Sequence, residues 1–341
     1  MRRKTTAVRI GNVVLSSEEP VLVQSMLNTS TREVDACVEQ AIRIIEAGGR
    51  LVRITAPGVK EAEMLGEIHR RLRERGYTTP ISADIHFVAE AASVAARYVE
   101  KVRINPGNFA DKRATFKKLT YTDEEYAAEL EILRQKFTEF LEVCRQYGTA
   151  VRIGTNHGSL SDRIMSRYGD TPAGMVEATM EYLRVCQACD FKDVVISLKS
   201  SDCRTMADAV RLLVEKMEAE GMCYPLHLGV TEAGEGEDGR IRSAVGIGTL
   251  LNEGIGDTIR VSLTGDPVEE IRTAKLILKT LGLRKGGIEV VSCPTCGRTR
   301  IDLIGLAKQV EEMVSSYDYD LKLAVMGCVV NGPGEAKEAD L

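Results

Sequence analysis

The chain has 341 residues, of which 44% are apolar and 28% are charged, and its net charge is −5. This length suits one large α/β domain followed by a smaller one. The absence of tryptophan and the slightly acidic balance argue against a nucleic-acid surface. No apolar run is long enough to span a bilayer, and the basic first residues lead into no apolar segment. We therefore expect a cytoplasmic protein.

Short strand-like runs alternate eight times with longer helix-like runs. The predicted strands are 21–26, 51–56, 81–86, 101–106, 150–156, 193–199, 226–234 and 257–263. The run 31–47 between the first two has the i, i+3, i+4, i+7 apolar spacing of a helix. Eight such units predict a (β/α)8 TIM barrel. An open doubly wound sheet is the alternative, which the even spacing of the eight units disfavours.

The remaining segments complete the expected organisation. The last barrel helix is predicted at 266–281, with Asp266 as the N-cap and Pro267 in the first turn. The charged segment 108–148 is predicted to form one long exposed helix. We expect a barrel domain over 1–284 and a small α+β domain over 285–341, shortened at its carboxyl end.

One short pattern, an arginine between two branched apolar residues, recurs in four predicted strands. The arginines are Arg53, Arg103, Arg152 and Arg260. Neighbouring side chains in a strand face opposite ways, so each arginine should point into the barrel when its neighbours face the helices. One interpretation is that each arginine forms a separate internal ion pair. Only Asp84 and Glu232 are carboxylates at comparable strand positions, however, which leaves an excess of positive charge. The pattern, with Lys199 ending another strand, favours a multiply charged anion at the carboxyl-terminal mouth.

Three of the nine cysteines lie in turns rich in glycine and proline. Cys293 and Cys296 flank Pro294-Thr295, and Cys328 lies in the segment 326–335. No histidine follows His227, so a zinc site would lack its fourth ligand. Three thiolates with one different ligand fit a [4Fe–4S] cluster, and Glu335 is the candidate for that ligand.

The other cysteines have simpler expected roles. Cys186 and Cys189 also form a C-x-x-C pair, but this pair lies in a helical run without a turn residue. We expect it to serve core packing. We expect the isolated cysteines to be packing residues or surface residues without a special role. They are Cys37, Cys144, Cys203 and Cys223.

These motifs resemble the 4-hydroxy-3-methylbut-2-enyl diphosphate synthases over essentially the whole chain. The resemblance is carried by the segments 23–26, 83–87, 154–160, 227–234, 256–262, 292–299 and 326–335. It implies a two-electron reduction of 2-C-methyl-D-erythritol 2,4-cyclodiphosphate, with ferredoxin or flavodoxin as the electron donor. The cyclic diphosphate opens and a hydroxyl group leaves as water.

The resemblance also implies roles for individual residues. Cluster ligands are expected at Cys293, Cys296, Cys328 and Glu335. Diphosphate-binding residues are expected at Arg53, Arg103, Asn105, Arg152, Asn156, Lys199, Arg260 and Ser262. Glu232 matches an acidic residue near the reacting carbons, and we expect it and Glu335 to act in catalysis.

A head-to-tail homodimer is expected, because the last barrel helix ends at the base of the barrel and the linker 284–287 is short. The cluster of one chain would then serve the barrel of its partner, as the resemblance implies. Two alternatives remain open. They are a zinc-stabilised TIM-barrel enzyme and a radical-S-adenosylmethionine-like one, each acting on a phosphorylated small molecule.

Overall fold

The computed structural model describes the whole chain except residues 112–119, 315–316, 318, 330–333 and 335. The chain forms two compact units, Met1–Leu281 and Gly282–Leu341. The sequence predicted a boundary after residue 284.

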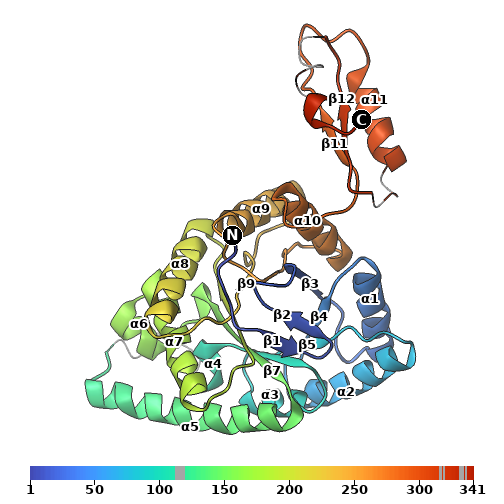
Figure 1. The fold of residues 1–341 in the computed structure, drawn as a ribbon. Helices are drawn as coiled ribbons and strands as arrows, with labels where there is room; N and C mark the ends of the chain where they lie inside the picture. The colour runs from blue at the N-terminus through green and yellow to red at the C-terminus, as the bar shows by residue number, and fades with distance from the viewer. Residues whose placement is uncertain (112–119, 315–316, 318, 330–333, 335) are drawn as a thin grey trace. The chain divides into compact units, whose positions relative to one another are not determined.

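The first unit is a nearly closed parallel barrel of eight strands in the order β8-β7-β6-β5-β4-β3-β10-β9 (Figure 1). The strands are β3 (Leu22–Met26), β4 (Leu51–Thr55), β5 (Ile81–Asp84), β6 (Lys101–Ile104), β7 (Ala150–Asn156), β8 (Val194–Lys199), β9 (His227–Leu228) and β10 (Thr258–Ile259). An isolated parallel bridge from Ile196 to Leu226 brings the last two edges together. The predicted TIM barrel is thereby confirmed.

A ring of helices surrounds these strands (Figure 1). The large helices are α1 (Val34–Glu46), α2 (Val59–Glu74), α3 (Ala89–Ala95), α5 (Asp123–Tyr147), α7 (Pro172–Ala188), α8 (Cys203–Ala219), α9 (Gly236–Asn252) and α10 (Pro267–Thr280). The Asp266 side chain accepts a hydrogen bond from the Val268 backbone N–H, which confirms the predicted N-cap. No helix among the described residues is both long and apolar enough to cross a membrane.

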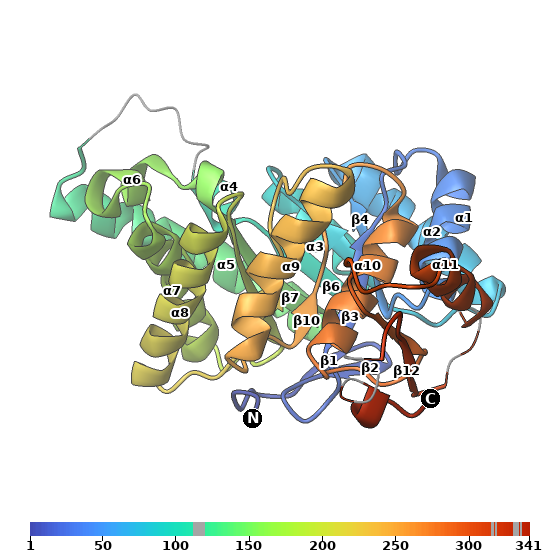
Figure 2. The same cartoon turned by 90° about the horizontal axis from the view of Figure 1, so that it is seen from above.

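An antiparallel hairpin, β1 (Val8–Ile10) and β2 (Val13–Leu15), closes the amino-terminal end of the barrel. Its alternate residues are buried against the first residues of the barrel strands, among them Leu22, Leu51 and Ala150. Figure 2 shows the hairpin at one end of the barrel, and α4 (Pro106–Phe109) and α6 (Asp162–Tyr168) at the other. Solvent and ligands therefore reach the interior from the carboxyl ends of the strands.

Two expectations about local structure were wrong. The segment 108–148 is not one exposed helix. The Asn105 side chain caps the short helix α4, and a capping box between Thr122 and Glu125 starts α5. One face of α5 is buried, including Phe137 and Phe140. The last two strands are also much shorter than predicted, because regular pairing stops after Leu228 and Ile259.

The second unit is a β–α–β arrangement with a short 3-10 turn, Ala336–Glu338. Its parallel strands β11 (Glu289–Ser292) and β12 (Lys322–Val325) are joined through α11 (Leu303–Val314). Leu303, Ala307 and Val325 form its small core. Parallel strands place their carboxyl ends at the same edge, so the segments after β11 and β12 leave the sheet side by side.

The hairpin gives a stability prediction. We expect Ile10→Ala to lower the free energy of unfolding of the barrel by about 2–5 kcal/mol, because it leaves a cavity against the strands. Urea denaturation followed by circular dichroism measures this change. The control is Val14→Ala on the exposed face of the same hairpin, which should change stability by less than about 0.5 kcal/mol. Equal losses of stability in the two variants would show that the hairpin does not pack against the barrel strands.

Candidate active site

The interior of the barrel is lined by long cationic side chains. Strand alternation places them inward: Arg53 on β4, Lys101 and Arg103 on β6, Arg152 on β7 and Lys199 on β8. All five are buried, with Lys101 0% exposed and Arg103 and Arg152 1% exposed. Arg260, which follows β10, is partly buried. The structure therefore brings together the four arginines that the sequence pattern singled out.

One carboxylate in the barrel holds two of these arginines. Asp84 at the end of β5 pairs with Arg53 at 2.5 Å and with Arg103 at 3.0 Å. Burial alone would raise the pKa of Asp84. The charges of Arg53, Arg103 and Arg152 outweigh burial and hold that pKa well below its usual range. Asp84 is consequently a fixed negative charge at the centre of the cationic group.

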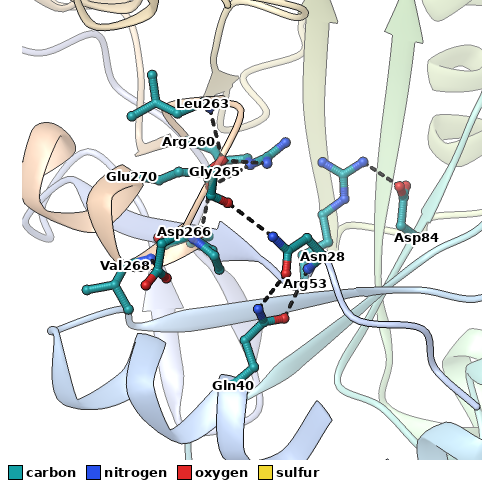
Figure 3. A network of polar contacts seen from close by, with 12 residues as sticks. Asn28, Gln40, Arg53, Asp84, Arg260, Leu263, Gly265, Asp266, Val268 and Glu270 are labelled. Carbon is teal, nitrogen blue, oxygen red and sulfur yellow. Dashed lines mark hydrogen bonds and ion pairs between the residues drawn. The ribbon is translucent and has the colours of Figure 1, made fainter. Parts of the chain in front are cut away.

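Arg260 has a separate partner that the sequence did not reveal. Glu270 on α10 is buried and accepts hydrogen bonds from Arg260 at 2.8 Å and 3.1 Å. The Glu270 carboxylate also accepts from the Leu263 backbone N–H and from the Ser25 hydroxyl. Figure 3 shows Arg260 with Glu270 on one side and Arg53 with Asp84 on the other. Glu270 thus orients Arg260 and stabilises the turn after β10.

Three further cations have no such partner. Lys101, Arg152 and Lys199 form no ion pair within the part of the chain that the structure describes, and the Nε and Nη1 atoms of Arg152 lack any hydrogen-bond acceptor there. Burial, followed by repulsion from neighbouring arginines, lowers the pKa of each of the three side chains well below its usual range. Buried cations without a counter-charge are costly. The interior therefore favours a ligand with more than one negative charge.

Two glycines make room for these long side chains. A Cβ atom on Gly154, at an inward position of β7, would lie 2.6 Å from Nε of Arg103. A Cβ atom on Gly229, directly after β9, would lie 2.6 Å from the Arg260 carbonyl oxygen and 2.9 Å from Nζ of Lys199. Any larger residue at either position would displace a cationic side chain.

Neutral hydrogen-bonding groups surround the mouth of the barrel. The amide of Asn105 donates to the Ser159 hydroxyl at 2.9 Å, and Asn156 accepts a long hydrogen bond of 3.5 Å from Arg103. Ser262 follows β10 and is partly buried. Burial, and then the nearby Arg103, lowers the pKa of His86 to about 4, so that its imidazole is neutral at physiological pH.

Glu232 lies in the loop after β9 and is exposed. Its φ angle is +53°, an unusual backbone conformation for a residue other than glycine. Such local strain is concentrated at functional sites. The structure places this carboxylate outside the buried cationic group.

A buried network behind the site supports these loops and was not predicted. Arg163 on α6 pairs with Glu181 on α7 at 2.7 Å and with Asp111 at 3.1 Å. The Tyr182 hydroxyl donates to the carbonyl oxygen of Pro106 in α4. No periodic signal connects these residues, because they come from separate loops and helices.

Three cysteines of the second unit lie around the paired carboxyl ends of β11 and β12. Cys293 follows β11 and its N–H donates to the Val325 carbonyl oxygen, while Cys328 follows β12. The two loops are joined by a hydrogen bond from the Arg300 N–H to the Gly327 carbonyl oxygen. Cys293, Cys296 and Cys328 all lie within electrostatic reach of Arg298 and raise its pKa. Hydrogen bonds from Arg298 lower the pKa of Cys296, which favours its thiolate form.

This donor set fits an iron–sulfur cluster in its chemistry. Thiolates are the usual ligands of such clusters, and Arg298 offsets part of their negative charge. No group of three potential ligands across the described residues is already arranged to hold a metal ion. Glu335, the predicted fourth ligand, lies outside the described residues.

The remaining cysteines belong to the barrel. Cys37, Cys144 and Cys186 are buried, and Cys189 is the C-cap residue directly after α7. Burial raises the pKa of Cys186 and of Cys144, which makes both thiols unreactive. Cys203 is partly buried and Cys223 is exposed.

Comparison with protein families gives matches over both units. The GcpE TIM-barrel domain matches residues 5–275, and the GcpE protein C-terminal domain matches residues 289–341.

Curated relatives carry one enzyme name. A protein of Parabacteroides distasonis named 4-hydroxy-3-methylbut-2-en-1-yl diphosphate synthase (flavodoxin) is 56% identical over 92% of this chain and 51% of its own length. A protein of Picosynechococcus named as the ferredoxin form is 48% identical over 99% of this chain and 84% of its own length. The chain thus spans about half the length of the first relatives it matches.

Among solved structures, dihydropteroate synthase of Yersinia pestis has a similar fold, with a TM-score of 0.54 over 82% of this chain and 100% of that chain. Its sequence identity to this chain is only 13%, so the likeness concerns the fold alone.

The shared carboxylate gives a second prediction. Asp84→Asn should destabilise the barrel by about 3–5 kcal/mol at neutral pH, because Arg53 and Arg103 lose their counter-charge. The folded-state pKa of Asp84 lies below its unfolded value of about 4. Its contribution is therefore present above about pH 4 and is lost as the pH falls below that value. Urea unfolding of both proteins across this range should show their difference shrinking toward low pH.

The matched control for this prediction is Asp35→Asn, since Asp35 pairs with Arg71 on the surface and its side chain is 83% exposed. This change should cost less than about 1 kcal/mol at any pH. An equally small loss of stability in Asp84→Asn would show that Asp84 is not an important counter-charge for Arg53 and Arg103.

Proposed function

The chain belongs to the GcpE family, and we propose that it reduces 2-C-methyl-D-erythritol 2,4-cyclodiphosphate to 4-hydroxy-3-methylbut-2-enyl diphosphate with loss of water. The names of the curated relatives support this activity. The observation that carries the proposal is a group of buried basic side chains with no carboxylate partner among the described residues: Lys101, Arg152 and Lys199. A diphosphate supplies the multiple negative charge that this interior requires.

The binding residues have complementary parts in this proposal. Arg53, Arg103, Arg152, Arg260 and Lys199 would bind the phosphate oxygens, while Asp84 and Glu270 keep three of the arginines oriented before the ligand arrives. Asn105, Asn156 and Ser262 would donate hydrogen bonds at the mouth. Such prior orientation reduces the entropy that would be lost on binding.

The proposed catalytic residues are Glu232 and Glu335. Glu232 would lie beside the carbon skeleton of the substrate, where its carboxyl group can hold or donate a proton to the departing hydroxyl group. Its exposed position in the loop after β9 leaves it accessible to a ligand at the mouth.

A [4Fe–4S] cluster held by Cys293, Cys296, Cys328 and Glu335 is the proposed cofactor. When bound, it would supply the electrons for the reduction. Placement of the three thiols around one edge of a parallel strand pair supports the assignment. A carboxylate ligand is harder than a thiolate and exchanges more easily, so Glu335 could yield its place to a substrate oxygen.

The proposed partners are an electron donor and a second copy of the chain. Relatives are named for flavodoxin and for ferredoxin, so a small electron-transfer protein of one of these kinds is expected, in the cytoplasm. The chain leaves α10 at the end of the barrel opposite the carboxyl ends of the strands. A head-to-tail homodimer would let the cysteines of one chain serve the barrel of its partner.

Reconstitution tests the function directly. After anaerobic reconstitution we expect about four iron atoms per chain and formation of the linear diphosphate from the cyclic one with a chemical reductant. Cys293→Ser, Cys296→Ser and Cys328→Ser should each lose iron and turnover, whereas the control Cys223→Ser should keep both. Bound zinc without iron would contradict the redox mechanism, and a complete cluster without turnover would contradict the proposed substrate.

Mixing of two inactive variants tests the dimer. Chains with Cys293→Ser keep the barrel cations, and chains with Arg152→Gln keep the cysteines. Co-expression should restore about a quarter of the wild-type activity per chain, because half of the dimers are mixed and each mixed dimer has one complete site in the trans arrangement. Each variant alone should remain inactive. Absence of recovery in mixed dimers isolated by two affinity tags would rule out the shared site.

A further inference from the structure

Lys101 is the most deeply buried of the basic side chains inside the barrel, and it is not one of the residues proposed to bind the phosphate oxygens. It opens β6 two residues before Arg103, on the same inward face. Its side chain is 0% exposed, and Nζ finds no hydrogen-bond acceptor among the described residues. An ammonium group in this position would be both desolvated and unpaired.

Among the described residues, the groups that face Lys101 carry no negative charge. Arg53 on β4 and Arg152 on β7 repel it, and Ser82 lies beside it on β5. His227 on β9 lies within its electrostatic reach. The side of the hairpin that packs against the base of the barrel is apolar.

Carboxylates elsewhere in the barrel are already engaged. Asp84, the next inward residue on β5, is shared by Arg53 and Arg103, and Glu270 is bound to Arg260. At the base of the barrel, Asp257 pairs with Arg2 at 2.7 Å and accepts a hydrogen bond from Thr5. None of these carboxylates is left to balance a positive charge on Lys101.

We infer that Lys101 is a neutral amine in the ligand-free protein and takes up a proton from solvent when a polyanion binds above it. The lone pair of Nζ forms the new N–H bond, so the step needs no oxidant, reductant or other reactant. This inference rests on the proposed function for the identity of the anion. It adds that substrate binding and protonation of Lys101 are coupled.

The electrostatics support this coupling. Burial, and then Arg152 and Arg53, lowers the pKa of Lys101 in the ligand-free protein. A diphosphate bound to Arg152 would cancel that repulsion and add attraction, which raises the pKa of Lys101 in the complex. Between the two pKa values, affinity falls as the pH rises, by up to about tenfold per pH unit for one proton.

The same coupling would favour the reaction. Cleavage of the carbon–oxygen bond of the cyclic diphosphate leaves the bonding electron pair on a phosphate oxygen and adds one negative charge to the group. The proposed electron donor supplies the two electrons, and the hydroxyl group leaves as water after gaining a proton. A protonated Lys101 beneath the phosphates stabilises the product-like charge more than the substrate charge.

Calorimetry of the reconstituted protein in buffers of different ionisation enthalpy measures the number of protons taken up. The ligands are the cyclic diphosphate and inorganic sulfate, neither of which titrates near neutral pH. Near neutral pH, the wild-type protein should take up about one proton per bound ligand. Lys101→Met should take up almost none, and its affinity should be nearly independent of pH.

Two further variants test whether the proton is taken up by Lys101 or by a neighbouring residue. Lys101→Arg carries a fixed charge, so it should bind ligand without proton uptake and recover the affinity that Lys101→Met loses at low pH. His227→Gln keeps Lys101 and should retain the uptake. Thermal unfolding should show that Lys101→Met is at least as stable as the wild type, because the change removes a buried amine that has no hydrogen-bond partner among the described residues. Lys101→Gln serves if Lys101→Met does not fold.

The outcomes distinguish this inference from the proposed function. Unchanged uptake in Lys101→Met, or loss of uptake in His227→Gln alone, overturns the inference, as does binding by the wild type without uptake. Sulfate binding with uptake that depends on Lys101, but no binding of the cyclic diphosphate, supports the inference and contradicts the proposed substrate. If neither anion binds, both proposals fail.

Discussion

The excess of buried positive charge inside the barrel is the constraint on which the rest of the structure depends. Several long basic side chains share one interior. Among the described residues, Asp84 balances two of the arginines and Glu270 balances Arg260. In an interior of low dielectric constant, such an arrangement is tolerated because the surrounding fold holds the charges in place. The unbalanced charge lowers the stability of the ligand-free protein, and this free energy is regained when an anion binds.

Several features of the first unit serve this constraint. The β1–β2 hairpin closes the base of the barrel with apolar side chains, so that water and ligands approach from the mouth. Glycines at inward positions give the arginines and Lys199 room to extend. The Arg163–Glu181 pair ties α6 to α7 behind the mouth. Preorganisation of this kind is what makes electrostatic binding effective in a site from which water is excluded.

The second unit has only a small hydrophobic core, and its strands position the cysteine side chains. Its parallel strand pair places two loops at one edge. The loop after β11 contributes two thiols and the loop after β12 contributes one, all near Arg298. So small a hydrophobic core supplies little stability of its own, and a bound cluster would add the cross-link that small domains commonly need.

The sequence by itself determined the barrel, because alternating periodicities of two and of about 3.6 residues are local signals. It also determined the inward direction of Arg53, Arg103 and Arg152, which follows from strand alternation. The same alternation would have identified Lys101, two residues before Arg103. Ionic partners, in contrast, were decided by the tertiary structure. Glu270 reaches Arg260 from a helix, and Arg163 meets Glu181 and Asp111 from separate segments. Contacts between segments depend on how helices pack around the barrel, and no local pattern encodes that packing.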